Sequence, residues 1–259
     1  MAGPHLSQNI DAVLLDLGNT LVSYYQATDF EPILERCITE VMSLLEDQGT
    51  SFLGLDVQAR AKALNGERPD LRVWPLRARL SQIFADGRES LPDELLEAMS
   101  QRFLEPIFAT GKLDPEAVPV LTALRGARFK IAIVSNTPWG SPGAAWRAEL
   151  SRRGLLDRVD EAVFCTDAGW RKPAPQIFQR ALDGLGVEAS RALFVGDDRH
   201  WDVQGAVAAG MVPVLYTPTG PTGRTGPTGP IAPVASCLTI GRLSDLLALL
   251  GQPRISPQG

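Results

Sequence analysis

Cysteine and histidine are scarce in this chain of 259 residues, which contains three cysteines and two histidines. The cysteines, Cys37, Cys165 and Cys237, lie far apart and form no C-x-x-C pair. This spacing favours free thiols in a reducing cytosol over a zinc site or a set of disulfides. We therefore expect a cytoplasmic protein whose fold does not depend on cross-links.

Long apolar runs and an excess of basic residues are missing as well. No apolar segment reaches the ~18 residues of a membrane-spanning helix, and the polar segment 1–9 lacks the apolar stretch of a signal peptide. The net charge is −5, whereas nucleic acids and anionic membranes attract basic patches. We expect neither kind of partner, and the sequence leaves the oligomeric state open.

What remains is a chain of ordinary globular composition, 44% hydrophobic and 21% charged. Its second half alternates short apolar segments with amphipathic ones. The apolar segments predict strands and the others predict helices, the strands at 130–134, 162–165, 192–195 and 212–216 and the helices near 120–124, at 177–185, 203–209 and 243–250. Together with an apolar segment at 12–15, this pattern predicts an α/β fold with a doubly wound parallel sheet covered on both faces.

The segment between the first strand and this alternating region has a different pattern. Apolar residues recur at helical spacing over 33–45, 76–84 and 95–103, and residues 22–112 contain no segment that predicts a strand. We therefore expect a core domain made of residues 1–21 and 113–259, with an all-helical domain, residues 22–112, inserted after the first strand.

Glycine occupies every third position over residues 220–230, as it does in collagen. So few triplets are too short for a triple helix, and the flanking segments are globular. We expect a mobile surface loop.

Polar residues follow three of the predicted strands: Asp16, the pair Ser135–Asn136, and the pair Asp197–Asp198. In a parallel sheet the carboxyl ends of the strands share one edge, where ligands bind. We therefore expect Asp16 and Asp197 to lie close enough to share Mg²⁺, which prefers carboxylate oxygens.

The same edge could carry out phosphoryl transfer. A carboxylate such as Asp16 can attack phosphorus, Ser135 can donate a hydroxyl, and Lys172 can supply a compact positive charge. Taken singly, each residue has a plainer interpretation: Asp16 as a turn residue, Ser135 as a helix cap and Lys172 as a surface lysine. Their common order and spacing favour a site.

At this point the chain resembles the haloacid dehalogenase superfamily, in the subclass with a helical cap after the first strand that includes phosphoglycolate and sugar phosphatases. The resemblance covers nearly the whole chain. It rests on the sequences Asp16-Leu-Gly-Asn-Thr20, Val134-Ser-Asn136, Gly169-Trp-Arg-Lys-Pro-Ala-Pro-Gln-Ile-Phe178 and Val195-Gly-Asp-Asp-Arg-His-Trp-Asp-Val-Gln-Gly-Ala206. It implies a Mg²⁺-dependent hydrolase acting on a small phosphorylated metabolite.

The resemblance also implies roles around the metal. Asp16 would be both the nucleophile and a metal ligand. The backbone carbonyl of Gly18 and the side chain of Asp197 would be the other protein ligands. Asp202 would order a metal-bound water or Lys172, with Asp198 beside it in the shell around the metal. Ser135, Asn136 and Lys172 would bind the phosphate, and Ser135 and Lys172 would act in catalysis.

One position departs from the family pattern. Phosphatases of the superfamily carry a second aspartate two residues after the nucleophile, which protonates the leaving group, and here that position is Gly18. Two alternatives follow: a weakly active or inactive relative that binds a phosphometabolite or a protein, and a metal-independent 2-haloacid dehalogenase. The acidic pair Asp197–Asp198 argues for metal and so against the dehalogenase. His200 is a candidate for the missing proton donor.

Four arginines are grouped near Trp74 in the predicted insertion: Arg68, Arg72, Arg77 and Arg79. One of them could bind a second anionic group of the substrate. The plainer interpretation is that they lie on solvated helix faces.

Overall fold

The computed structural model describes residues 10–25, 29–49, 56–84, 91–218 and 237–253. The glycine-rich segment 220–230 lies outside these ranges, so the expected surface loop stays a prediction. All three cysteines are free thiols, as predicted. Within the described ranges, none of the helices has the length and apolar character needed to cross a membrane.

Six strands form one parallel sheet in the order β5-β4-β1-β6-β7-β8. Their bounds are β1 Ala12–Leu15, β4 Lys130–Ser135, β5 Glu161–Phe164, β6 Ala192–Gly196, β7 Val212–Tyr216 and β8 Leu238–Ile240. The central strand β1 pairs with β4 and β6, so that Leu15 lies opposite Ile133 on one side and Val195 on the other. The predicted parallel α/β fold is confirmed.

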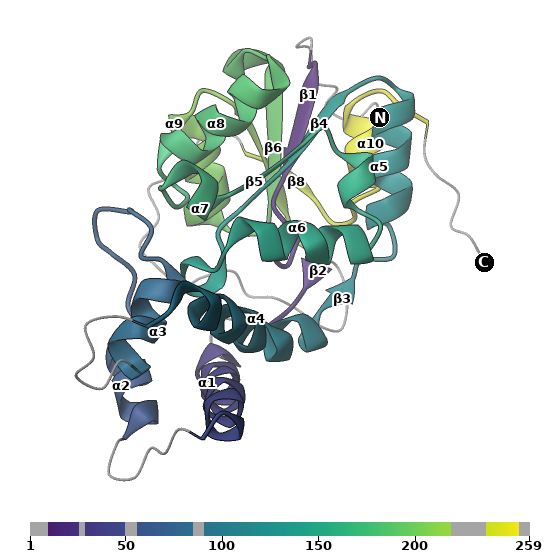
Figure 1. Ribbon diagram of the computed structural model, residues 1–259. Helices are drawn as coiled ribbons and strands as arrows, with labels where there is room; N and C mark the ends of the chain where they lie inside the picture. The colour runs from purple at the N-terminus through teal and green to yellow at the C-terminus, as the bar shows by residue number, and fades with distance from the viewer. Residues whose placement is uncertain (1–9, 26–28, 50–55, 85–90, 219–236, 254–259) are drawn as a thin grey trace.

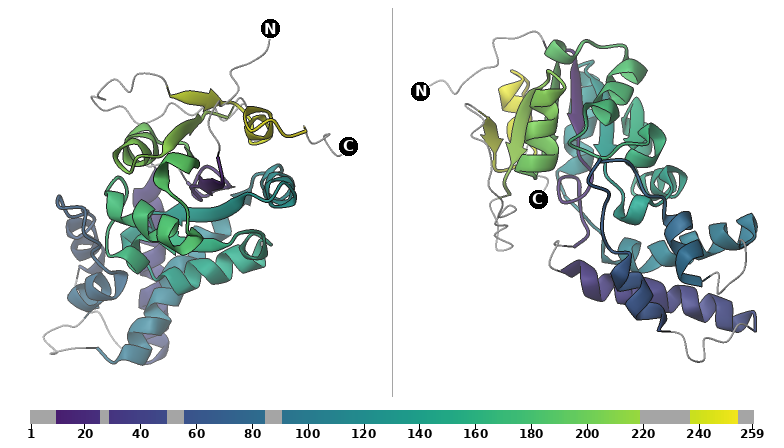
Figure 2. Two further views of the ribbon diagram at one scale, coloured as in Figure 1. Left: turned by 90° about the horizontal axis from the view of Figure 1, so that it is seen from above. Right: turned by 90° about the vertical axis from the view of Figure 1, so that its left-hand side faces the viewer.

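Helices cover both faces of this sheet (Figures 1 and 2). Val13 and Leu15 share one buried cluster with residues of α5 (Ala117–Gly126), α6 (Gly143–Arg152) and α10 (Asp245–Leu249). Ala12 and Leu14 belong to a second cluster with residues of α8 (Pro175–Leu185) and α9 (Gly205–Ala208). Alternate residues of β1 therefore face opposite layers, as the period of a strand requires. Both faces are apolar because both are covered.

Four helices follow β1 and gather beyond one end of the sheet (Figure 1). They are α1 Phe30–Asp47, α2 Val57–Ala63, α3 Leu76–Phe84 and α4 Asp93–Thr110. The two long helices, α1 and α4, pack against each other, and the buried face of α1 carries Ile33, Leu34, Cys37, Ile38, Val41 and Leu45. We call residues 29–111 the helical insertion.

The expectation of no strand between residues 22 and 112 was wrong. The chain enters and leaves the helical insertion through a two-stranded antiparallel ladder of β2 (Val22–Ser23) and β3 (Lys112–Leu113). Two residues per strand are too few for an alternating pattern to show in the sequence. The ladder joins the two connecting segments side by side.

The segment after β6 also differs from the prediction of a single α-helix over 203–209. Residues Arg199–Gln204 form a π-helical turn, η5, which continues into the short α9. The side chain of Asp198 accepts hydrogen bonds from the backbone N–H groups of His200 and Trp201 at its start. Four further short helices are η2 Pro138–Gly140, η3 Leu156–Arg158, α7 Cys165–Ala168 and η4 Ala189–Arg191.

Candidate functional site

The residues that follow the strands meet at one end of the sheet, as predicted. Asp16 follows β1, Ser135 ends β4 and Asp197 follows β6. Together with Lys172 and Asp202 they line a cavity of about 260 Å³. The parallel topology explains this meeting, because it places the carboxyl ends of neighbouring strands along one edge. We call this space the strand-end cavity.

Lys172 is fully buried between two carboxylates of this cavity. Its Nζ atom lies 2.7 Å from Asp16 Oδ1 and 2.6 Å from Asp202 Oδ1. Burial alone would lower the pKa of the Lys172 ammonium, but the charges and hydrogen bonds of Asp16 and Asp202 outweigh it and raise that pKa above its ordinary value. Lys172 is therefore a permanent positive charge beside the predicted nucleophile.

Asp202 is held in place from two sides. One carboxylate oxygen accepts from Lys172, and the other accepts from the backbone N–H of Asp198 at 2.9 Å. Gly196 makes this close packing possible, because a Cβ atom there would collide with the Asp202 carboxyl. Burial and the neighbouring Asp16 raise the pKa of Asp202, and Lys172 opposes that shift.

The carboxylates of Asp16, Asp197 and Asp202 each offer an oxygen atom, and these atoms lie within 4.8 Å of one another. Hard oxygen ligands of this kind suit Mg²⁺. Of the charged residues that line the strand-end cavity, four are aspartates, including Asp198, and two are cations, Lys172 and Arg171. A divalent cation would complement this excess of negative charge, so the residues fit such an ion. The backbone of Gly18 lines the same cavity.

Asn136 connects two of the predicted site segments. Its side-chain amide accepts from the backbone N–H of Lys172 at 2.8 Å and donates to the carbonyl of Lys172 at 3.3 Å. The neighbouring Ser135 is buried, and its hydroxyl donates to the backbone carbonyl of Asn136 at 3.2 Å. Both amide atoms of Asn136 thus fix the backbone that carries Lys172.

The glycine at position 18 is not required by its backbone conformation. Its φ lies outside the left-handed region, and a Cβ atom built there meets nothing within 4 Å. The next residue, Asn19, has the positive φ of the turn, 62°, a conformation that asparagine tolerates. The position therefore has room for a side chain.

Sequence reasoning missed the aromatic part of the cavity wall. Tyr24, Tyr25, Trp146 and Trp201 line it, and the rings of Tyr24 and Trp146 meet edge-on at 5.4 Å. Burial raises the pKa of both phenols above the ordinary value, so both remain protonated. The adjacent tyrosines directly after the first turn were the one available signal. Trp146 lies on α6 and has no local signal at all.

Arg171 was also missed as a cavity residue, although it is the neighbour of Lys172. By contrast, the four arginines of the insertion do not line the strand-end cavity. Arg79 is fully buried elsewhere, Arg77 pairs with Asp93 at 2.6 Å, and Arg72 stacks on Trp170 at 4.5 Å. The suggestion that one of them contacts substrate in this cavity is therefore not supported.

His200, the candidate proton donor, lies outside the cavity too. It is exposed on η5, and its Nδ1 atom lies 2.8 Å from Gln204 Oε1. Two residues of this turn line the cavity instead: Asp202, and Trp201, which is 37% exposed. In this arrangement His200 is not positioned to protonate a leaving group in the cavity.

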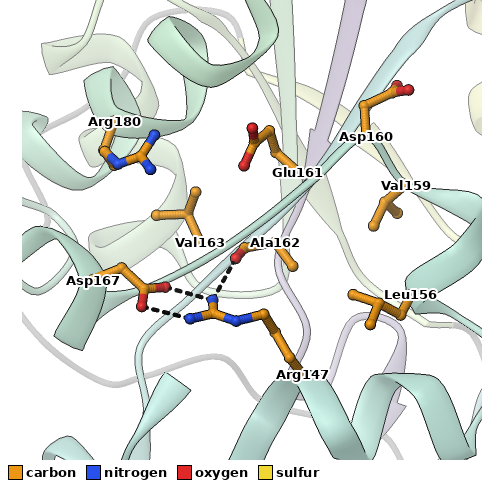
Figure 3. A pocket seen from close by; sticks show the side chains of 9 residues that line it. All are labelled: Arg147, Leu156, Val159, Asp160, Glu161, Ala162, Val163, Asp167 and Arg180. Carbon is orange, nitrogen blue, oxygen red and sulfur yellow. Dashed lines mark hydrogen bonds and ion pairs between the residues drawn. The ribbon is translucent and has the colours of Figure 1, made fainter. Parts of the chain in front are cut away.

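A second cavity, of about 290 Å³, lies beside the edge strand β5 (Figure 3). Arg147 spans it, donating to both carboxylate oxygens of Asp167 at 2.8 Å and to the carbonyl of Ala162 at 2.9 Å. The arginine thereby satisfies a carbonyl on the open edge of the sheet, which is a common way to protect an edge strand. Its lining residues lie away from Asp16 and include no carboxylate–lysine pair, so we assign this cavity a structural origin.

Comparison with known proteins gives a consistent result. The family model of the haloacid dehalogenase-like hydrolases matches residues 10–210. The chain is 35% identical over 208 residues to the glyceraldehyde 3-phosphate phosphatase of Methanopyrus kandleri, an alignment that covers 79% of this chain and 83% of that protein. It is 34% identical over 215 residues to the phosphoglycolate phosphatase of Rhodospirillum rubrum, covering 81% and 80% of the two chains.

Among solved structures, the 2-haloacid dehalogenase of Pseudomonas syringae pv. Tomato DC3000 is similar with a TM-score of 0.64. The likeness covers 93% of this chain and 98% of that one, at 24% sequence identity. At this identity the likeness concerns the fold alone.

Proposed function

Because the chain belongs to the haloacid dehalogenase-like hydrolases, we propose that it is a Mg²⁺-dependent phosphatase that acts on a small phosphorylated metabolite through an aspartyl-phosphate on Asp16. The observation that carries this proposal is the position of Lys172. Its ammonium binds Asp16 and Asp202 together, beside a cluster of carboxylates that suits a divalent cation.

The proposed reaction uses the residues in two steps. In the first, a carboxylate oxygen of Asp16 attacks phosphorus, and the bond from phosphorus to the ester oxygen breaks. Lys172 holds Oδ1 of Asp16 and places positive charge next to the phosphoryl oxygens, and the buried Ser135 hydroxyl is a donor to them. In the second step a water molecule attacks the same phosphorus and the bond from phosphorus to Asp16 breaks, which releases phosphate and restores the carboxylate. One proton of that water passes to solvent, and the departed ester oxygen takes one from solvent.

Asp16, the Gly18 carbonyl and Asp197 would hold Mg²⁺, and the bound ion would offset the repulsion between the carboxylate and the phosphate. Asp202 would keep Lys172 in place, with Asp198 holding Asp202 through its backbone N–H. Asn136 would contribute to phosphate binding mainly by fixing the backbone of Lys172, since both its amide atoms are bound there.

No described carboxyl group replaces the acid that is missing at Gly18, because the other carboxylates of the cavity belong to the metal cluster or to its supports. We therefore propose a preference for leaving groups of low pKa, such as those of acyl phosphates or sugar 1-phosphates. A positioned acid contributes ~10²–10⁴ in rate, so esters of ordinary alcohols should react more slowly.

We further propose that the helical insertion, within the domain limits 22–112, is a cap that covers the cavity while residues 1–21 and 113–259 carry the chemistry. Tyr24 and Tyr25, on the segment that leads into it, already form part of the cavity wall. A cap at this place would exclude water during the reaction.

Gly18 is the specific observation in favour of a second function, a weakly active relative that binds a phosphometabolite. Both functions are tested by assaying a panel of phosphorylated metabolites. Each assay is run with Mg²⁺, with EDTA, and with EDTA followed by excess Mg²⁺. We expect turnover that EDTA abolishes and Mg²⁺ restores. Turnover that survives EDTA contradicts the metal-dependent mechanism, and binding without any turnover supports the second function.

A further inference from the structure

Arg171 is the cation of the strand-end cavity that the proposed reaction does not use. It lines the cavity, and its side chain is only 13% exposed. Its Nη1 atom donates to the carbonyl of Thr137 at 3.0 Å and lies 3.6 Å from Glu67 Oε1. Among the described residues, no partner engages its Nη2 or Nε atoms, so most of its donors are available.

Where Arg171 meets Glu67, positive charge exceeds negative charge. Its carboxylate neighbour, Glu67, is shared with Arg79, whose Nη2 atom binds the other oxygen at 2.9 Å. One carboxylate therefore serves two largely buried guanidinium groups. Burial lowers the pKa of Arg79, Glu67 opposes that shift, and the nearby charge of Arg171 adds to it. Since buried charges are costly unless they are paired, an additional anion at Arg171 would stabilise this region.

The backbone of Arg171 is fixed relative to the catalytic residues. Its N–H donates to the carbonyl of Leu71 in the helical insertion at 2.8 Å, and Val73 donates back to Gly169 at 3.1 Å. The next residue, Lys172, is bound to Asn136 and Asp16. Two consecutive residues thus carry two cations, one at the nucleophile and one where the insertion meets the core. This arrangement fixes the backbone of Arg171 relative to Asp16.

We propose that Arg171 binds a second anionic group of the substrate, and that the substrates are therefore small metabolites with a phosphate ester at one end and a carboxylate or a second phosphate at the other. The planar guanidinium offers paired donors that match either group. The cavity of about 260 Å³ lies below the ~300–1,000 Å³ of pockets for drug-sized ligands, which favours short molecules. The proposal rests on the phosphatase function proposed above.

The test compares pairs of substrates that differ in one anionic group. For the carboxylate, the pair is 2-phosphoglycolate and its carboxamide; for the phosphate, it is propane-1,3-diyl bisphosphate and 3-hydroxypropyl phosphate. Each is assayed with Mg²⁺ on the parent enzyme, on Arg171→Gln and on Arg171→Lys. We expect the parent to prefer, in at least one pair, the member with the second anionic group. In Arg171→Gln, kcat/KM for that member should fall about 10–100-fold, the typical effect of losing a hydrogen bond to a charged group, through KM more than kcat.

The member of each pair that lacks the second anionic group is the internal control, because it reports folding and chemistry without that group, and its kcat/KM should change little. Arg171→Lys should recover part of the loss. Arg77→Gln is the matched control, since Arg77 pairs with Asp93 and does not line the cavity, and it should leave every preference unchanged.

The pair that shows the preference identifies the carboxylate or the phosphate as the bound group. A parent enzyme that hydrolyses both members of both pairs equally well overturns the proposal, whether or not the variants fold. So does an equal loss for members with and without the second anionic group in a folded Arg171→Gln, which would indicate a purely structural role. If the parent hydrolyses no ester at all, the phosphatase function itself fails, which is a distinct outcome.

Discussion

Lys172 and Arg79 are both fully buried cations, one at the strand ends of the sheet and the other in the helical insertion. Lys172 binds the carboxylates of Asp16 and Asp202 and lines a cavity. Arg79 binds the carbonyls of Leu64 and Gly66 and the single carboxylate of Glu67, and it lies against the ring of Trp74, away from that cavity. The comparison teaches that a buried charge alone does not mark a functional site. What distinguishes Lys172 is its place among carboxylates that open onto a cavity.

Removing the proposed nucleophile should give the largest effect at the strand ends. We expect Asp16→Asn to lower kcat by about 10⁴–10⁶-fold, as the loss of a nucleophile or its base does in other hydrolases, with an unchanged circular dichroism spectrum. Asp11→Asn is a matched control, because Asp11 lies just before the same strand but pairs on the surface with Arg191. Full activity in a folded Asp16→Asn enzyme would exclude Asp16 as the nucleophile.

The Lys172 side of the comparison should show a smaller loss of rate. Lys172→Ala removes the charge beside Asp16, and the loss of one preorganised electrostatic contact commonly lowers kcat by ~10²–10³. Lys172→Arg should recover little, since the wider guanidinium places its donors differently. Steady-state kinetics on one good substrate measure both variants. A Lys172→Ala enzyme with kcat close to that of the parent would place Lys172 outside the reaction.

Substituting Arg79 should lower the stability of the fold rather than kcat. Arg79→Met leaves the carbonyls of Leu64 and Gly66 without their donor, and a buried acceptor left without a partner typically costs ~1–3 kcal/mol of unfolding free energy. We expect a lower denaturation midpoint with nearly unchanged kcat on a phosphate ester that has no second anionic group. A large loss of kcat in an enzyme that remains folded would instead give the insertion a direct part in the chemistry, and the contrast with Lys172 would disappear.

The smallest effect is expected at Gly18. Because the position has open space and an ordinary φ, Gly18→Asp should change stability little. In the parent, log kcat/KM for aryl phosphates should fall steeply as the leaving-group pKa rises, and the new carboxyl should flatten that slope. The gain on alkyl phosphates should stay below the ~10²–10⁴ of a well-positioned acid. A flat slope in the parent would mean that another group already donates the proton.

The sheet and the candidate site at its strand ends could be predicted because their signals are local. Asp16, Ser135 and Asp197 each follow a short apolar segment, and parallel topology then brings them together without any knowledge of side-chain packing. The ladder of β2 and β3 and the short helix α2 were missed because two to seven residues carry too little periodicity.

The cavity wall was harder to foresee because it depends on contacts between segments far apart in the chain. Trp146 contacts Tyr24, which lies 122 positions earlier in the chain. Arg171 is held at the cavity by its contacts with Leu71 and Glu67. Tertiary packing also buries Arg79 away from the cavity, so it cannot contact a substrate there. Sequence motifs thus indicate the chemistry, while the choice of substrate depends on tertiary packing that they do not encode.

The most direct test of the central claim is to trap the enzyme during turnover. The parent enzyme is mixed with Mg²⁺ and a good substrate, quenched in acid within one turnover, and analysed by peptide mass spectrometry. We predict one added phosphoryl group on the peptide that contains Asp16, sensitive to hydroxylamine as an acyl phosphate is, and absent in Asp16→Asn. A phosphoryl group on another residue, or an enzyme that turns over rapidly while no phosphoryl-enzyme forms at any quench time, would contradict the account.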